Sequence, residues 1–174
     1  MERQKIQQTE LDSAVKFRLG FPMGIFELAD FTGLDVIHKA TVEMHTRDKK
    51  VILPHPTIEQ LFNEKKLGQK SGEGFYKYSD DKYERIPLSE ELAQKCDPVQ
   101  IIANILNNAA WLVTNNASDI DEIEKAANLG LGLKKPLFDT AKEIGMQKIV
   151  EELKKLSNKH GTFYEPDPLL LSMC

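Results

Sequence analysis

The chain has 174 residues, of which 41% are hydrophobic, and a formal net charge of -4. This is enough apolar material for a packed core, while no run approaches the roughly 18 apolar residues that a membrane span needs. The acidic balance argues against a nucleic-acid surface, because neutralising phosphates takes a basic excess. The first ten residues are too polar for a signal peptide, and Cys96 and Cys174 show no metal spacing. We therefore expect a cytoplasmic protein without a metal site or a membrane segment.

Short amphipathic helices are predicted through the first half of the chain. Thr9 and Asp12 have the spacing of a capping box, and the apolar residues that follow recur at helical spacing over residues 9–19. Gly20 and Pro22 should end this helix.

Three further helices are expected before residue 68. A second helix should end at Gly33, and Asp35 should cap a third. Thr57 and Gln60 should begin a fourth helix that ends at Gly68.

The pattern changes after residue 74. Residues 75–78 and 82–86 are aromatic and β-branched, and Ser79, Asp80 and Asp81 lie between them, which predicts a small β-hairpin near residues 74–86. Residues 87–97 are expected to be a linker.

The second half begins with a strong helix signal. Asp97 and Pro98 place an N-cap residue and a proline at the start of an apolar pattern that runs to about Asn116. Ser118 and Asp121 then repeat the spacing of the first capping box.

An internal repeat connects the two halves. Seven residues recur 112 positions later, namely Gly20, Phe26, Ala29, Gly33, Ile37, Pro54 and Pro56 as Gly132, Phe138, Ala141, Gly145, Ile149, Pro166 and Pro168. Glycines at helix ends and apolar residues at packing positions indicate one helical unit used twice, over residues 1–86 and 98–174. In this register the first unit lacks its first helix, and the second unit lacks its end.

The sequence offers no catalytic constellation. A dinucleotide site needs a strand, a glycine-rich turn and a helix, but Gly130 and Gly132 follow a helical pattern. Gly68, Gly72 and Gly74 lack the lysine and hydroxyl residue of a phosphate-binding loop. The four histidines are scattered singly, without a partner at a convincing spacing: His38, His45, His55 and His160. We expect surface or helix-end positions for them and assign no catalytic residue.

Two stretches resemble the C-terminal domain of the 3-hydroxyacyl-CoA dehydrogenases: LDSAVKFRLGFPMGIFELADFTGLDVI and HPTIEQLFNEKKLGQKSGEGFYKY. The stretch SDIDEIEKAANLGLGLKKPLFDTAKEIG is similar to the weaker second copy found in long, multifunctional members. The resemblance implies an all-α fold like the 6-phosphogluconate dehydrogenase C-terminal domains, in two copies. In this family a Rossmann domain binds NAD and supplies the catalytic histidine and glutamate, and the helical domain closes over the acyl-CoA.

The resemblance also assigns residues. Phe21, Pro22, Met23 and Gly24 match a family element that borders the acyl pocket, although Ile25 stands where proline is usual. The family's glycine-rich terminal motif is matched by Gly68, Lys70, Gly72, Gly74, Phe75 and Tyr76, for which we favour a structural role. The asparagine that helps hold the substrate would lie on the absent first helix. For Asn104, Asn107 and Asn108 of the second unit we favour capping or surface roles.

Two functions are therefore expected. The first is the helical, substrate-side and dimerisation portion of an NAD-dependent 3-hydroxyacyl-CoA dehydrogenase of fatty-acid β-oxidation, inactive alone. Its partners would be acyl-CoA, a Rossmann domain in the same or a separate polypeptide, and possibly an enoyl-CoA hydratase domain. The alternative is a helical association module without its own ligand, which predicts loose self-association.

Overall fold

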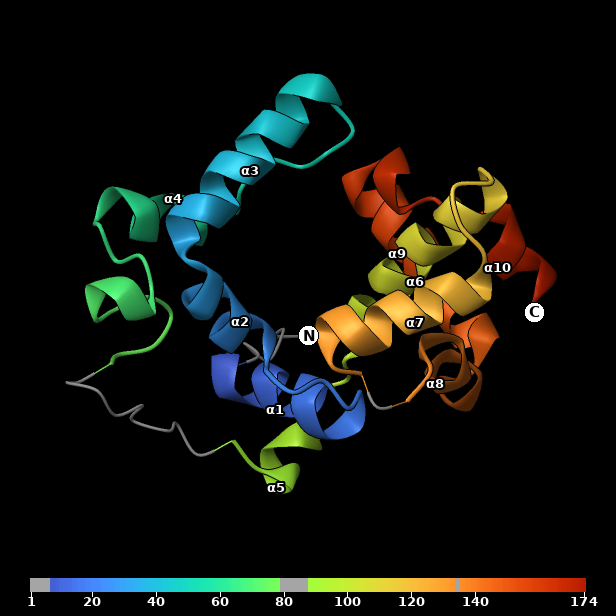
Figure 1. The fold of residues 1–174 in the computed structure, drawn as a ribbon, viewed down its shortest axis with the longest axis horizontal. Coiled ribbons are helices and arrows are strands. Elements are labelled where there is room, and N and C mark those ends of the chain that lie inside the picture. Colours follow the sequence, from blue (N-terminus) through green and yellow to red (C-terminus); the bar gives the residue numbers. More distant parts are fainter. Residues whose placement is uncertain (1–6, 79–87, 134) are drawn as a thin grey trace. The chain divides into compact units, whose positions relative to one another are not determined.

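The computed structural model describes residues 7–78, 88–133 and 135–174, and the regular structure of these residues is helical (Figure 1). The α-helices are α1 Gln8–Arg18, α2 Ile25–Thr32, α3 Leu34–Arg47, α4 Pro56–Asn63, α5 Glu90–Ala93, α6 Val99–Thr114, α7 Ile120–Leu131, α8 Leu137–Ile144, α9 Met146–His160 and α10 Pro168–Ser172. Two short 3-10 turns, Gln69–Ser71 and Thr162–Tyr164, complete the regular structure. The predicted all-α class is thus confirmed for the described residues, none of whose helices is long and apolar enough to cross a membrane.

The chain divides into two compact units. Unit 1 comprises Met1–Ser13 and Met23–Cys96, and unit 2 comprises Ala14–Pro22 and Asp97–Cys174. The division falls within α1, so this helix contributes to both units. The segment predicted as a linker contains α5, and Ala93 and Cys96 are buried there.

Unit 1 has an unusually polar interior. Leu34, at the start of α3, is fully buried, but so are the carboxyl-bearing residues Asp12 and Asp30, and Glu27 is only 9% exposed. Buried carboxyl groups need hydrogen-bond donors around them, since an unpaired buried charge is costly. The arrangement of those donors defines the candidate site described below.

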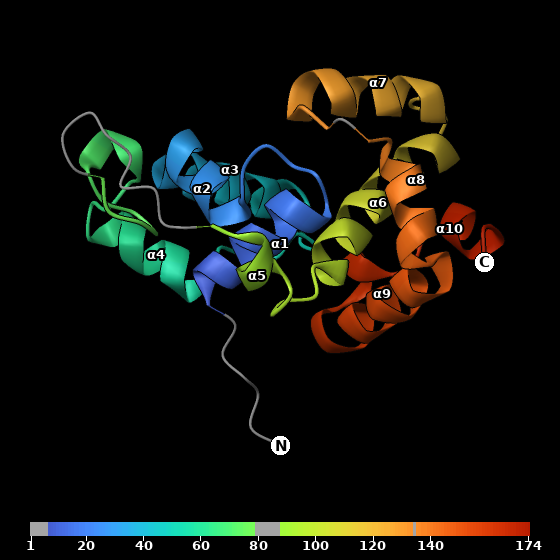
Figure 2. The same ribbon diagram turned by 90° about the horizontal axis from the view of Figure 1, so that it is seen from below.

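Unit 2 is built around α6. This helix packs against α8, α9 and α10 (Figure 2). Its side chains Ile102 and Leu106 are buried together with Ile149 and Leu153 of α9 and Leu170 of α10. Contrary to the capping or surface role expected for it, Asn107 of α6 is also buried.

Four pairs of helices begin 112 residues apart. Helices α2 and α8 start at Ile25 and Leu137, and α3 and α9 start at Leu34 and Met146. Helices α1 and α7 start at residues 8 and 120, and α4 and α10 at residues 56 and 168, which is the same difference in each pair. The glycines between the paired helices also agree, with φ of 97° at Gly33 and 100° at Gly145.

Several predicted helix caps are wrong. Thr9 does not cap α1, because the helix already begins at Gln8 and Asp12 contacts α2 instead. The N-cap of α7 is Asp119, whose carboxylate accepts a hydrogen bond from the Glu122 amide at 2.8 Å, rather than Ser118.

The caps of α3 and α4 were also misplaced. Gly33 precedes α3, so Asp35 lies within its first turn. His55, whose ring nitrogen accepts from the Thr57 amide, caps α4. A shift of one or two residues is the usual error at helix ends.

Residues 75–78 do not form the first strand of the predicted hairpin. Within the described part of the chain the only ladder-type contacts are isolated bridges, Gly68 with Glu73 and Glu73 with Lys77. The reason is that the amides of Phe75 and Tyr76 donate to a side chain and are therefore not available to a strand partner. The other expected strand, residues 82–86, lies outside the described residues.

Candidate functional site

Helix α2 begins on a buried carboxylate. Asp12 of α1 accepts hydrogen bonds from the Phe26 amide at 2.9 Å and from the Glu27 amide at 3.0 Å. These amides belong to the first turn of α2, where the helix offers no acceptor of its own. A negative charge at this end is also favoured by the helix dipole. Asp12 therefore fixes where α2 starts.

The stretch predicted to border an acyl pocket immediately precedes this helix start. Phe21 and Met23 are partly exposed, Pro22 is exposed and Gly24 is buried. The boundary between the units falls inside the stretch, with Phe21 and Pro22 in unit 2 and Met23 and Gly24 in unit 1.

Gly24 lies against the capping carboxylate. A Cβ at this position would lie 2.2 Å from Cγ of Asp12, which is closer than non-bonded atoms approach. The Gly24 amide donates to the Glu27 side chain at 2.9 Å. The departure from the family at Ile25 does not move the helix, since α2 still begins at this residue.

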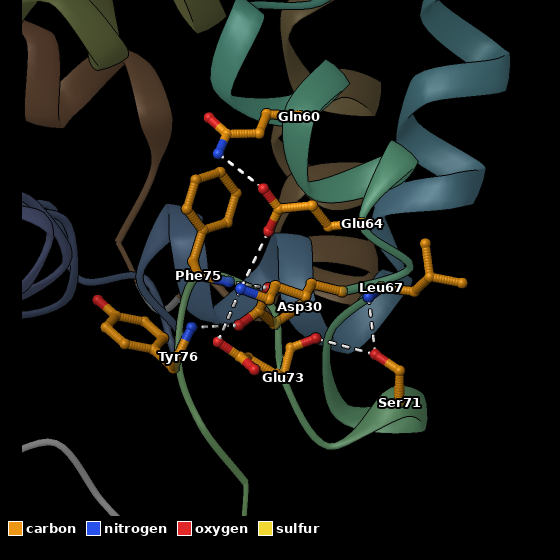
Figure 3. Close-up of polar contacts among 9 residues, drawn as sticks. Asp30, Gln60, Glu64, Leu67, Ser71, Glu73, Phe75 and Tyr76 are labelled. Carbon is orange, nitrogen blue, oxygen red and sulfur yellow. Dashed lines mark hydrogen bonds and ion pairs between the residues drawn. The ribbon is translucent and has the colours of Figure 1, made fainter.

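A second buried carboxylate, Asp30, lies near the end of α2 and holds the glycine loop, which we define as residues 68–78. Its two oxygens accept from the amides of Phe75 and Tyr76, each at 2.9 Å (Figure 3). The Tyr78 hydroxyl donates to it at 2.7 Å. Hydrogen bonds to an ionised acceptor are about twice as strong as neutral ones.

The glycines allow the loop to approach α2 closely. A Cβ at Gly74 would lie 2.2 Å from Oδ1 of Asp30 and 2.7 Å from the Cα of Gly68. Gly68 lies over the Asp30 backbone, and Gly72 ends the 3-10 turn in the left-handed conformation. The pair of aromatic rings Phe26 and Phe75, with centroids 4.6 Å apart, packs beside this contact.

Lys70 joins the glycine loop to α3. Its ammonium group pairs with Asp35 in the first turn of that helix. The hydrogen bond from Lys70 is the main cause that lowers the pKa of Asp35 below its usual value. The leucine amide of α3's first residue, Leu34, donates to the Leu67 carbonyl at 3.2 Å, so both ends of this contact lie next to Gly68.

Tyr76 connects the two carboxylates. Its amide donates to Asp30 and its hydroxyl donates to Asp12 at 2.8 Å. Burial raises the pKa of the Tyr76 hydroxyl strongly, and the neighbouring Asp12 raises it further. Burial also raises the pKa of Asp12, against the opposing effect of its hydrogen bonds with Phe26, Tyr76 and Glu27, while the charge of Glu27 adds to the rise. Tyr76 thus remains a proton donor.

The chemistry of this cluster is that of hydrogen-bond acceptors already in use. Asp12 and Asp30 together accept four backbone amides and two phenol hydroxyls. The described residues contain no group of three or more side chains that could hold a metal ion. The sequence prediction named the glycine loop but missed Asp12 and Asp30. The close spacing of glycines in the loop was a signal that something packs against it, but not of what.

One histidine has a partner that the sequence spacing did not indicate. His38 of α3 contacts Glu59 of α4, with 2.9 Å between Nε2 and the carboxylate, and stacks on Phe62 with ring centroids 4.2 Å apart. Its Nδ1 is buried without a hydrogen-bond partner among the described residues. His38 is therefore a packing residue between two helices rather than the surface residue expected.

Unit 2 repeats one part of this arrangement. Glu124 of α7 accepts from the amides of Leu137 and Phe138 at the start of α8, at 2.6 and 2.8 Å. Glu124 and Phe138 lie 112 residues after Asp12 and Phe26, so equivalent positions make equivalent contacts. The counterpart of Asp30 is Lys142, which instead pairs with Asp139 on the surface.

The match to known families is confined to the first half of the chain. Residues 1–78 match the family model described as 3-hydroxyacyl-CoA dehydrogenase, C-terminal domain. The mitochondrial hydroxyacyl-coenzyme A dehydrogenases of Rattus norvegicus and Homo sapiens are each 42% identical over 79 residues, which is 44% of this chain. The match spans 25% of the length of these relatives. The family expected from the sequence is confirmed for this half.

Solved structures extend the similarity of fold to nearly the whole chain. The 3-hydroxybutyryl-CoA dehydrogenase of Escherichia coli aligns with a TM-score of 0.76 over 97% of this chain and 55% of its own, at 18% identity. The dehydrogenase part of multifunctional enzyme 1 from C. elegans aligns with a TM-score of 0.61 over 94% of this chain and 41% of its own, at 20% identity. At these identities the likeness is one of fold.

Proposed function

We propose that this chain, whose residues 1–78 match the C-terminal domain of the 3-hydroxyacyl-CoA dehydrogenases, is the helical, substrate-side part of such an enzyme. The reaction of the complete enzyme is the oxidation of 3-hydroxyacyl-CoA to 3-oxoacyl-CoA with NAD, as in fatty-acid β-oxidation. The observation that carries the proposal is the 42% identity over the segment that contains both carboxylate contacts of α2.

The NAD site belongs to a Rossmann domain outside these residues. Binding a pyrophosphate takes a strand that leads through a glycine turn into a helix. The described residues contain no strand, and the glycines of the loop are packed against Asp30 instead of facing a ligand. We therefore assign NAD, the catalytic histidine and the catalytic glutamate to that partner domain, and no catalytic step to this chain. An enoyl-CoA hydratase domain is a further possible partner.

Within the complete enzyme, residues 21–24 border the acyl chain. Their position depends on the start of α2, which Asp12 fixes through the Phe26 and Glu27 amides. The glycine loop then holds the far end of α2 through Asp30. The role of this loop is structural: it makes α2 rigid so that Met23 and Gly24 stay in place.

The two units are copies of one helical unit of the 6-phosphogluconate dehydrogenase C-terminal type, and we place the boundaries at residues 1–86 and 98–174. Four pairs of helix starts that differ by 112 residues support this interpretation. The equivalent contacts of Asp12 and Glu124 with the following helix support it independently. A duplicated unit can supply both halves of a two-fold interface within one chain.

An enzyme assay tests the first part of this proposal. The isolated chain, incubated with acetoacetyl-CoA and NADH, should show no turnover above the buffer rate, because the hydride carrier and the acid-base residues are supplied elsewhere. Turnover that scales with the concentration of the purified chain would overturn the proposal.

The alternative, an association module without a ligand, is favoured by apolar side chains on the surface of unit 1. Phe31 is 60% exposed and Met44 is 55% exposed. Calorimetry with CoA esters separates the two functions, since the association module should release no heat of binding. Light scattering over a concentration series tests the self-association that this alternative predicts; a clean monomer at the highest concentration would count against it.

The proposed location is the cytoplasm, because both cysteines are free thiols, which suits a reducing compartment. The rat and human relatives carry the word mitochondrial in their names. A fluorescent fusion of the full-length natural protein would distinguish the two locations.

A further inference from the structure

The two units differ in how their equivalent helices are covered. In unit 2, α6 packs against α8, α9 and α10. Subtracting 112 from the bounds of α6, residues 99 and 114, gives positions -13 and 2, so no described residue of unit 1 is equivalent to this helix.

The residues that would lie under such a helix are open in unit 1. Thr140 of α8 is 6% exposed, while its counterpart Leu28 of α2 is 46% exposed. Ile149 and Leu153 of α9 are fully buried, while their counterparts Ile37 and Thr41 of α3 are partly exposed. The same holds for Leu170 of α10 and Ile58 of α4. We call Leu28, Ile37, Thr41 and Ile58 the open face.

A pair of backbone groups in unit 1 also lacks the partner that its counterpart has. In unit 2 the Asn107 side chain of α6 donates to the Glu165 carbonyl and accepts from the Asp167 amide, both at 2.8 Å. The counterparts of these two groups, the Leu53 carbonyl and the His55 amide, have no hydrogen-bond partner among the described residues. An acceptor and a donor two residues apart are what one carboxamide can bridge.

The backbone at this place has the same shape in both units. His55 has φ -58° and ψ 143°, and Asp167 has φ -63° and ψ 142°. Each lies between two prolines, residues 54 and 56 in one unit and 166 and 168 in the other, which restrict the chain in the same way. The carboxamide-binding geometry is therefore preformed in unit 1.

We infer that the open face of unit 1 binds one amphipathic helix that these 174 residues do not contain, with the side-chain pattern of α6. Its apolar face carries small and branched residues at the spacing of Val99, Ile102, Ala103, Leu106 and Ala110. At the position of Asn107 it carries an asparagine, whose amide bonds to the Leu53 carbonyl and the His55 amide. Helix-in-groove binding of this kind is recognised through apolar anchors at helical spacing. The inference does not depend on dehydrogenase activity.

A labelled peptide tests the inference with the full chain. The probe has the sequence of residues 97–116 and a fluorescein label, and binding is followed by fluorescence anisotropy. We expect saturable binding in the micromolar range, weakened about tenfold when the residue equivalent to Asn107 is replaced by alanine. In the chain, Leu28→Glu should weaken binding by at least about tenfold. The matched control is Val42→Lys, which introduces the residue found at the equivalent position Lys154, and it should leave binding unchanged.

The location of the peptide is read from backbone amides by NMR. Peptide binding should shift the His55 amide resonance and leave that of Asp167 unchanged. Four results would overturn the inference: no binding up to the solubility limit of the peptide, equal weakening by Leu28→Glu and Val42→Lys, a shift at Asp167 without one at His55, or displacement of the peptide by excess unlabelled chain. The last result would show that a second copy occupies the face. Circular dichroism confirms that both variants remain folded.

Discussion

The Asp30 carboxylate should carry a large share of the stability of unit 1. Asp30→Ala removes the acceptor of three hydrogen bonds, from the amides of Phe75 and Tyr76 and from the Tyr78 hydroxyl. The hydroxyl is only partly buried and can bond to water instead. Each of the two amides loses its acceptor at a cost of about 1–3 kcal/mol, so we expect a loss of about 3–5 kcal/mol in the free energy of unfolding of unit 1.

Urea unfolding followed by circular dichroism measures this loss, and hydrogen exchange assigns it to a place. Because the two units can unfold separately, exchange at the Phe75 and Tyr76 amides is the decisive observation. These amides should be protected in the wild type and lose that protection in Asp30→Ala. The matched control is Asp121→Asn, an exposed carboxyl group outside this cluster. An Asp30→Ala variant as stable as Asp121→Asn, with Phe75 and Tyr76 still protected, would refute the reasoning.

Three further predictions concern single contacts. Gly74→Ala should destabilise unit 1 by about 2–4 kcal/mol in urea unfolding, because its Cβ would overlap with Asp30; a change within error of Gly130→Ala, where no atom lies within 4 Å, would contradict the close approach. Asn107→Ala should cost about 2–4 kcal/mol of unit 2 stability by leaving the Glu165 carbonyl and the Asp167 amide without partners, whereas the exposed Asn108→Ala should cost little. Burial raises the folded-state pKa of Asp12 above its ordinary value of 3.8, so its contribution to the free energy of unfolding is largest below that pH and falls as the pH rises through the folded pKa; the stability difference between the wild type and Asp12→Asn should therefore decrease from acid to neutral pH, and a difference that increases would contradict the sign.

The helices could be predicted from the sequence because apolar spacing is a local signal. The starts expected near Thr9 and at Asp97 lie within two residues of the observed starts at Gln8 and Val99. The caps were less predictable. A serine or threonine three residues before an acid indicates a capping box only if that acid turns back to its own helix, and Asp12 reaches the next helix instead.

The candidate site depends on contacts that are distant in the sequence. Asp30 is bound by amides 45 and 46 residues away, and no local pattern around FELADF indicates this. For the same reason the aromatic run FYKY was predicted as a strand, since its β propensity is real while the acceptor of its amides is a side chain on another element. The glycine spacing of the loop did carry information, because close approach to Asp30 excludes a Cβ at Gly74.

The most direct test of the proposed function is reconstitution from separate polypeptides. The chain is mixed with the separately produced Rossmann domain of a 3-hydroxyacyl-CoA dehydrogenase, and the oxidation of NADH by acetoacetyl-CoA is measured. We predict no turnover by either polypeptide alone, and turnover by the mixture that increases with the concentration of this chain until it saturates. Turnover by this chain alone, or a mixture that stays inactive although the partner domain binds NADH, would contradict the proposed function.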